Sequence, residues 1–258
     1  MSPAPTPRTE PTVQARLRIV RSVTGNARFA VTIAAVLAVL AAVNVLLKFG
    51  PPHMGLILGP AVALVLVILA RRYGLTWDHL GMSRRALRKG IGYAAVAVGA
   101  VAAVYVTGAL LPLTRAAFLD ARYHLKPGAA LLAAFVVVPL GTVLLEEVAF
   151  RGVLLGLVHR HRGPGSAKLF SSGLFGLWHI LPSLRLARAN QAVGVVFGAG
   201  TGGQLLAVAG AVGFTALAGL LLCELRRRSG SLLAAAGLHW ATNALGVVLA
   251  TAVWAVRA

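Results

Sequence analysis

Long apolar blocks, separated by short polar and basic stretches, run through most of the chain. Most of these blocks are about 17 to 25 residues long, the length at which an α-helix crosses a bilayer. They cover residues 29–47, 54–70, 91–111, 129–158, 167–183, 204–224 and 231–256. The pattern predicts an all-α protein, a polytopic transmembrane helical bundle of about seven spans, with eight as the alternative.

Two regions depart from this simple pattern. Block 129–158 is too long for one straight crossing, so we expect Pro139 to kink it, unless its last turns leave the membrane. Residues 1–28 have no apolar run, and they carry four prolines and five arginines. This composition predicts a disordered basic tail before a membrane domain over 29–258. Block 29–47 exceeds the usual apolar core of a signal peptide and is interpreted as a retained span.

The overall composition supports a membrane protein and excludes several other classes. Of 258 residues, 58% are apolar and only 12% are charged, and the mean hydropathy is +0.82, so a water-soluble globule is excluded. The single cysteine, Cys223, rules out a disulfide framework and a CxxC metal site. The net charge of +19 invites a nucleic-acid role, but the basic residues lie in clusters between apolar blocks, which argues against nucleic acid as a partner.

The basic clusters also predict how the chain is oriented. With seven spans, 17 of the 25 Lys and Arg residues lie on the side of the tail and of loops 71–89, 159–168 and 225–230. Seven lie on the other side. The positive-inside rule therefore places the N-terminus in the cytoplasm. The Ala- and Arg-rich composition favours a bacterial plasma membrane, and the sequence does not define an oligomeric state.

Two adjacent acids lie inside the fourth apolar block. A charged side chain in a span costs about 2.5–3.5 kcal/mol on insertion scales, and such residues face a protein interior or a wet cavity. Arg151 follows Glu147 by four residues, so these two share a helix face, whereas Glu146 points about 100° away. The spacing predicts that Arg151 holds Glu147 and that Glu146 is free for chemistry. The alternative is a buried ion pair that only fixes helix packing.

Two later blocks carry intramembrane histidines. His179 follows Phe175 by four residues, and His239 precedes Asn243 by four, so each pair shares one helix face. For each histidine, the alternative is a simple hydrogen bond to a neighbouring helix. Trp178, beside His179, is either a packing residue or part of a site.

The depth of these residues in the membrane favours one common site. Glu146 lies 13 residues from the basic end of its block, and His179 and His239 each lie 11 residues from theirs. At the helical rise these separations are about 20, 17 and 17 Å. Three spans thus place a carboxylate and two imidazoles, with the Asn243 amide close by, at similar depth. Convergence of this kind is hard to explain by packing alone.

Such a set of side chains has the parts needed to hydrolyse an amide. A carboxylate beside a histidine takes a proton from water, and a histidine with an asparagine donates hydrogen bonds to an oxyanion. No GxSxG serine is present, and no histidine follows or precedes Cys223 closely. Two histidines and a glutamate, here His179, His239 and Glu146, are also the ligands of catalytic zinc, although HExxH is absent. Metal-activated and glutamate-activated water therefore both remain open.

Three motifs in order resemble the CPBP family, which includes the CAAX prenyl proteases and the Abi or bacteriocin-processing proteins. They are EEVAFR at 146–151, FGLWH at 175–179 and HWATN at 239–243, and together they fall within about 140–245. The resemblance implies a CAAX-protease-like membrane domain and an intramembrane endopeptidase, often labelled a metalloprotease. It also implies a peptide or protein substrate reached from the cytoplasmic side.

The resemblance further implies a role for each motif residue. Glu146 and His179 would activate water, and His239 and Asn243 would stabilise the oxyanion. The remaining candidates would orient the site or contact substrate: Glu147, Arg151, Phe175 and Trp178. The cofactor is either a divalent metal such as zinc or none. Two alternatives to an enzyme stand: a non-catalytic membrane protein that binds a peptide or lipidated partner, and a proton-coupled transporter.

Overall fold

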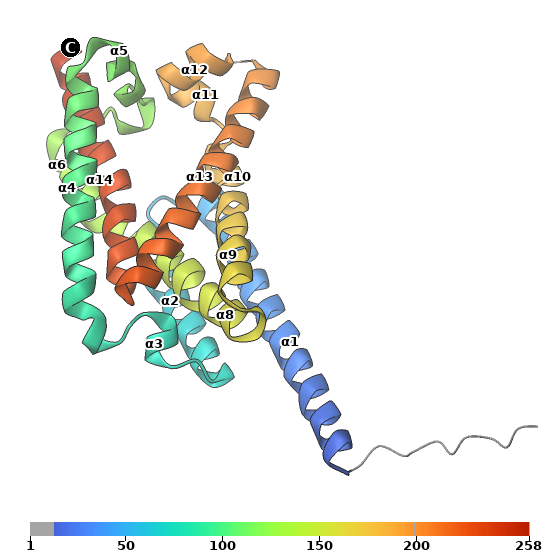
Figure 1. The fold of residues 1–258 in the computed structure, drawn as a ribbon. Helices are drawn as coiled ribbons and strands as arrows, with labels where there is room; N and C mark the ends of the chain where they lie inside the picture. Colours follow the sequence, from blue (N-terminus) through green and yellow to red (C-terminus); the bar gives the residue numbers. More distant parts are fainter. Residues whose placement is uncertain (1–12, 199, 258) are drawn as a thin grey trace, which may run out of the picture.

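The computed structural model describes residues 13–198 and 200–257, and within these ranges the chain is helical with no strand. The long helices are α1 (Val13–Phe49), α2 (Gly55–Tyr73), α4 (Leu87–Leu110), α9 (Pro164–Trp178), α13 (Thr201–Ser229) and α14 (Leu232–Arg257). Figure 1 shows them as a bundle whose two tallest parts, α4 with α14 and α13 with α9, diverge from a common base. The predicted all-α fold is confirmed.

A long helix of mixed geometry occupies the middle of the bundle. It consists of α6 (Pro127–Leu132), η4 (Ala133–Val137), η5 (Pro139–Val143), α7 (Leu144–Glu146), η6 (Glu147–Leu154) and α8 (Leu155–Arg162), with η4, η5 and η6 in π-helical form. Pro139 begins η5, so the expected irregularity falls where a backbone N–H is missing. Widened turns of this kind often mark functional sites. We call this composite the central helix.

Six segments are long and apolar enough to cross a membrane, rather than the predicted seven. They are Thr24–Phe49, Gly55–Tyr73, Arg84–Leu110, Pro127–Ser183, Thr201–Ser229 and Leu232–Val256. The fourth has 57 residues and joins the predicted blocks 129–158 and 167–183. Inside it, Gly163 has φ of +84°, and α9 then packs back against α8. The two predicted blocks therefore exist as separate helices joined by a tight turn.

The predicted tail over residues 1–28 is wrong in its second half. Residues 13–28 belong to helix α1, and residues 1–12 lie outside the described part of the chain. The prolines all precede Val13, whereas the following Ala, Leu, Gln and Arg residues favour helix, so α1 extends beyond its apolar block.

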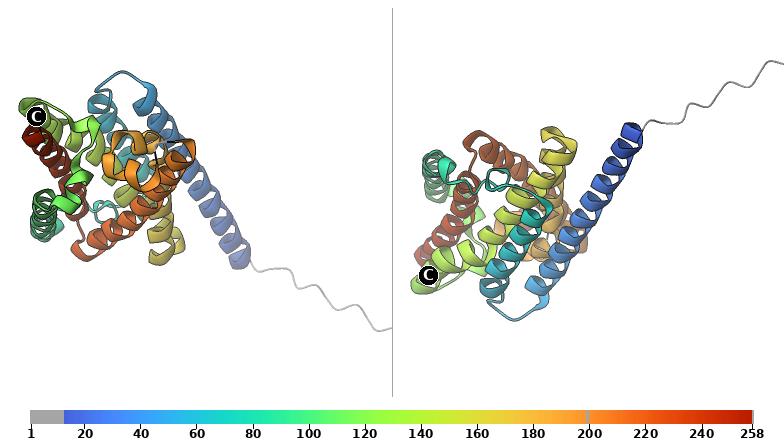
Figure 2. Two further views of the ribbon diagram at one scale, coloured as in Figure 1. Left: turned by 90° about the horizontal axis from the view of Figure 1, so that it is seen from above. Right: turned by 90° about the horizontal axis from the view of Figure 1, so that it is seen from below.

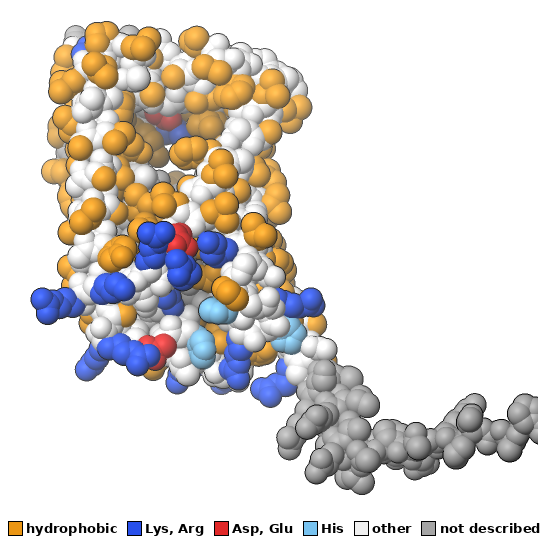
Figure 3. Space-filling view, viewed as in Figure 1, with side chains coloured by type: hydrophobic (Ala, Val, Ile, Leu, Met, Phe, Trp, Pro, Cys, Tyr) orange, Lys and Arg blue, Asp and Glu red, His pale blue; other side chains and the backbone are white. Residues whose placement is uncertain are grey.

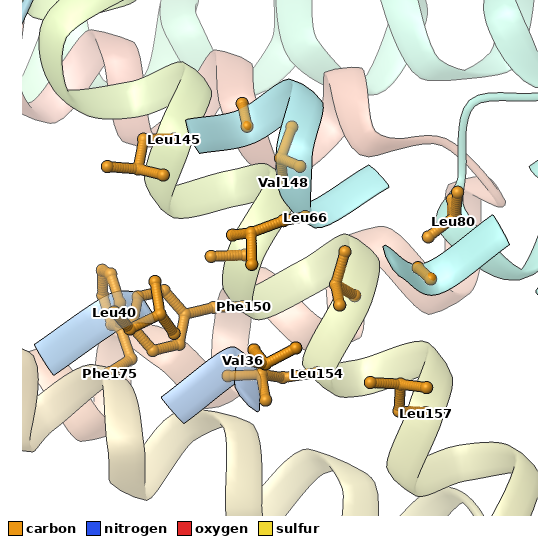
Figure 4. Packing of buried hydrophobic residues seen from close by; sticks show 14 of the residues in the cluster. Val36, Leu40, Leu66, Leu80, Leu145, Val148, Phe150, Leu154, Leu157 and Phe175 are labelled. Carbon is orange, nitrogen blue, oxygen red and sulfur yellow. The ribbon is translucent and has the colours of Figure 1, made fainter. Parts of the chain in front are cut away.

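The core surrounds the central helix. Val148, Phe150 and Leu154 belong to one buried cluster with Val36 of α1 and Leu66 of α2 (Figure 4). Glycine permits the closest contact in this region, because a Cβ at Gly59 of α2 would collide with the Leu140 carbonyl oxygen of η5. The backbones of the central helix and α2 are therefore in close contact just N-terminal to the two glutamates.

The two ends of the bundle differ in charge and shape. Lys and Arg side chains gather over the end that carries α3 (Trp77–Leu80) and α8, which we call the basic end (Figure 3). The opposite end carries α5 (Pro112–Arg115), η2 (Ala116–Phe118), η3 (Ala121–Tyr123), α10 (Ile180–Ser183), α11 (Leu186–Ala189) and α12 (Gln191–Phe197). Between the two diverging parts at this end the surface is hollowed, and the view from above shows α11 and α12 covering part of the hollow (Figures 2 and 3).

Candidate active site

A cavity of about 800 Å³ opens in the hollowed half of the molecule. Its inner polar lining comes from four helices and the turn after α9, and it includes Asn44, Glu146, Trp178, His179 and Asn243. Its outer lining includes three basic side chains near the end opposite the basic end, namely Lys48, His53 and Arg122. The cavity therefore connects a buried carboxylate with a rim of positive character.

Glu146, the last residue of α7, reaches the cavity while remaining 5% exposed. Its Oε1 accepts a hydrogen bond of 2.9 Å from the indole Nε1–H of Trp178. Its Oε2 is buried and accepts no hydrogen bond, and it lies 3.6 Å from Nε2 of His239. One carboxylate oxygen is thus held by Trp178, and the other is buried beside His239 without a hydrogen bond.

Glu147 does not line the cavity: its Oε1 contacts two side chains of the protein interior, and its Oε2 is buried without a hydrogen bond. Its Oε1 lies 3.1 Å from Nη1 of Arg151 and 2.8 Å from Nδ1 of His239. The Arg151 side chain is completely buried, and its Cζ lies 3.8 Å from the ring centre of Phe175, a cation–π contact. The predicted division between the two glutamates is therefore present: Arg151 pairs with Glu147, and Glu146 faces the cavity.

His239 connects the two glutamates. Its Nδ1 is hydrogen bonded to Glu147, so Nδ1 carries a proton when that carboxylate is ionised. Its Nε2 then faces Oε2 of Glu146, and it donates a proton there only when the ring is an imidazolium. His239 itself is not among the cavity-lining residues, whereas Asn243, one turn along α14, is. The structure thus separates the pair that the sequence places together.

His179 ends α9 and is partly exposed in the cavity. Its Nδ1 lies 2.7 Å from the backbone oxygen of Phe175. A carbonyl oxygen only accepts hydrogen bonds, so Nδ1 carries the proton and the neutral ring presents Nε2 as an acceptor. The Phe175 spacing that the sequence singles out therefore orients His179 through the backbone, and it leaves the basic nitrogen free.

One polar residue of the site was missed. Asn44 of α1 donates a hydrogen bond of 2.9 Å from Nδ2 to the carbonyl oxygen of Trp178, and it lines the cavity. The signal was present, because Asn44 is the one amide side chain in the first apolar block and a polar group at that depth needs a partner. Trp178, expected to contact substrate, is itself a hydrogen-bond donor to Glu146.

The candidate metal ligands do not form a metal site in this arrangement. Within the described residues, no group of three or more His, Cys, Asp or Glu side chains is placed to hold an ion. The hydrogen bonds of His239 and His179 are made by Nδ1 and leave each Nε2 able to bind a metal, but of the three candidate ligands only Glu146 and His239 approach each other. The geometry of these side chains thus does not fit a three-ligand zinc centre.

The comparison with known families agrees with the motifs. Residues 128–245, which contain the central helix, α9 and the two glutamates, match the type II CAAX prenyl endopeptidase Rce1-like family. The part of the chain that carries the three motifs is therefore similar to that family. No curated protein and no solved structure matches the chain. The Rce1-like region includes every residue of the inner cavity lining except Asn44, which α1 contributes from outside it.

Proposed function

We propose that the chain is an intramembrane endopeptidase that hydrolyses a peptide bond with water activated by Glu146 and His179. Similarity to the Rce1-like family supports a CAAX-type endopeptidase in general. The observation that carries the finer proposal is the contrast at positions 146 and 147. Glu146 lines the cavity, whereas its neighbour Glu147 does not and contacts Arg151 and His239 through Oε1.

The chemistry we propose needs only groups that line the cavity. Glu146 takes a proton from water, and His179 accepts a hydrogen bond from the same water through Nε2. The water oxygen bonds to the peptide carbonyl carbon, and the Asn243 amide donates a hydrogen bond to the resulting oxyanion. Collapse of this intermediate breaks the carbon–nitrogen bond, and the proton on Glu146 passes to the leaving amine.

The buried groups behind the cavity have a positioning role in this proposal. Trp178 fixes the rotamer of Glu146, and His239 links Glu146 to the Glu147–Arg151 pair. Arg151 is in turn packed against the Phe175 ring, on the helix that ends in His179. A rigid ion pair therefore connects the two helices that supply the base and its partner.

The location of the cavity bears on substrate access. The N-terminus is proposed to be cytoplasmic, because the basic end would then face the cytoplasm. The basic rim of the cavity, with Lys48, His53 and Arg122, lies near the other end of the bundle. A substrate reached from the cytoplasm, as the family resemblance implies, would conflict with this orientation. We infer that the substrate enters from the far side or from within the bilayer.

Thiol labelling of intact cells tests this orientation. Single cysteines would replace His53 and Arg160, which are both exposed, while the native Cys223 is buried. A membrane-impermeant maleimide is expected to label His53→Cys and to spare Arg160→Cys. The reverse labelling would place the basic end outside and would restore cytoplasmic access.

Peptide cleavage by the purified protein tests the proposed function. The native protein, Glu146→Gln and Glu224→Gln would be incubated in liposomes with a peptide library, each with and without a chelator. Glu224 serves as the control because it lies at the basic end and pairs with Lys168, Arg227 and Arg228. Cleavage is expected to disappear only in Glu146→Gln. Equal cleavage by Glu146→Gln would contradict the proposal, and tight peptide binding without cleavage by the native protein would favour a non-catalytic binder.

A further inference from the structure

A second, separate cavity lies at the basic end. It has a volume of about 260 Å³, lies between α3, α8, α9 and α13, and shares no lining residue with the cavity of the candidate active site. The basic side chains that line it are His79, His159, Lys168, Arg226 and Arg227, and one acid, Asp78, also lines it. Nothing in the proposed hydrolysis uses these groups.

Arg226 is the unusual member of this lining, because it is buried without an ionic partner. Arg226 is only 7% exposed, and its guanidinium forms no salt bridge within the described part of the chain. Nη2 donates to the backbone oxygens of Asp78 and His79 at 2.9 and 3.1 Å, while Nε is buried without a hydrogen bond. The hydrogen bonds of this buried cation thus go to carbonyl oxygens, and such a cation is a place where an anion gains stability.

The acids nearby are already engaged by other cations. The carboxylate of Asp78 lies 2.7 Å from the Arg85 guanidinium, and that of Glu224 pairs with Lys168, Arg227 and Arg228. Neither acid therefore serves as the counter-ion of Arg226. The charge left over within the cavity is positive.

The start of α9 adds a further attraction for anions. This helix of 15 residues begins at Pro164, and its N-cap residue Gly163 supplies no side chain to accept the first N–H groups. Pro164, Ala167 and Lys168 of this first turn line the cavity, so the positive end of the helix dipole lies beside the same space as Arg226. Pro164 has no N–H and the N–H of Ala167 donates to the Gly163 oxygen, so the helix contributes its dipole here rather than free donors. Helix terminus and buried guanidinium are independent features that converge on one cavity.

We propose that this cavity is a binding site for a phosphate group, held by Arg226, Lys168 and the N-terminus of α9. Guanidinium and ammonium groups are the side chains that recognise phosphate oxygens, and a helix N-terminus adds a favourable dipole. The cavity lies where span Thr201–Ser229 ends in three arginines, at the level expected for lipid head groups. The phosphate group belongs either to an anionic lipid or to a small soluble phosphate.

Binding by the full-length protein in neutral detergent separates these sources. The probes are inorganic phosphate, short-chain phosphatidylglycerol and short-chain diacylglycerol, and the readout is the shift in thermal unfolding midpoint with probe concentration. Variants Lys168→Gln and Arg226→Gln are compared with Arg228→Gln. The last is a matched control, because it also removes one cation from Glu224 but lies outside the cavity.

Phosphatidylglycerol is expected to raise the unfolding midpoint of the native protein and of Arg228→Gln. The apparent affinity for phosphatidylglycerol should be at least fivefold weaker in Lys168→Gln. A response to inorganic phosphate as well would indicate a soluble phosphate. Arg226→Gln also breaks bonds to α3, so Arg226→Lys is included, and it should retain part of the affinity if it folds. The proposal is overturned if diacylglycerol acts as strongly as phosphatidylglycerol, if neither phosphate probe binds, or if Arg228→Gln weakens binding as much as Lys168→Gln.

Discussion

Glu146 and Glu147 are neighbours in sequence, identical in chemistry and both nearly inaccessible, yet their surroundings differ completely. Glu147 forms an ion pair with a buried arginine and a hydrogen bond with a buried histidine on the side of the protein interior. Glu146 accepts one indole N–H, lines a cavity, and has its other oxygen buried beside His239. A single helical step separates a carboxylate that stabilises the fold from one that is available to react.

The comparison shows how a membrane protein accommodates a reactive acid. Each buried charge is costly in a bilayer, so one of the two is neutralised by Arg151, whose guanidinium also packs on Phe175. That pair then supports His239, which faces the free oxygen of Glu146. In the proposed mechanism, the ion-paired side of the helix therefore positions the side that lines the cavity. Substitutions around Glu147 should therefore change mainly the unfolding free energy, and substitutions around Glu146 mainly the cleavage rate.

The largest effect should come from breaking the ion-paired side. Arg151→Gln leaves the Glu147 charge buried with only His239 beside it, which typically costs about 3–5 kcal/mol of unfolding free energy. Thermal and denaturant unfolding in detergent would measure this loss. A double variant that also carries Glu147→Gln should recover part of it, because no unpaired charge then remains. Unchanged stability in Arg151→Gln would show that this ion pair does not support the fold.

His179→Gln tests the cavity side. This variant removes the free Nε2 acceptor while keeping a polar side chain of similar length, so we expect cleavage to fall about 100-fold or more. The unfolding midpoint should change little, because His179 is partly exposed and its one hydrogen bond is to its own helix. A comparable loss of stability and activity would instead indicate that His179 only closes the end of α9.

Trp178→Phe tests the hydrogen bond that holds the Glu146 side chain, because it removes the donor and keeps the glutamate. The change deletes the indole donor to Oε1 and keeps an aromatic ring against Phe150. The loss of one hydrogen bond to a charged group should lower the cleavage rate about tenfold. Rate measurements under saturating peptide would separate this effect from weaker substrate binding.

The smallest effect is expected at the rim, far from both glutamates. Burial raises the pKa of Asp120, but the hydrogen bonds and charge of Arg122 outweigh it and hold that pKa below its ordinary value. The Asp120–Arg122 pair therefore stabilises the fold at neutral pH, and this contribution is lost as the pH falls through the lowered pKa. Asp120→Asn should lose about 1 kcal/mol at pH 7 and converge with the native protein in acid. Unfolding midpoints across a pH series would reveal this convergence, and parallel curves would contradict it.

Much of this arrangement could be predicted from the sequence. The apolar blocks and the i,i+4 spacing at Glu147 and Arg151 indicated the helices and the ion pair, because both depend on local periodicity. The role of His239 could not be predicted, since its pairing with Glu147 depends on how α14 packs across the central helix. The sequence around Glu146 also has no pattern that predicts π-helical turns. Asn44 could not be placed in the site from a motif, because α1, which carries it, contains none of the three motifs.

The most direct test compares Glu146→Gln with Glu147→Gln in the same liposomes. Cleavage rate per folded molecule and unfolding midpoint would both be recorded for each variant. Glu146→Gln should lose cleavage by a factor of about 100 to 10,000 at a nearly native midpoint, whereas Glu147→Gln should lose stability first. Equal loss of cleavage at unchanged stability in both variants would contradict the division between a reactive and a structural glutamate.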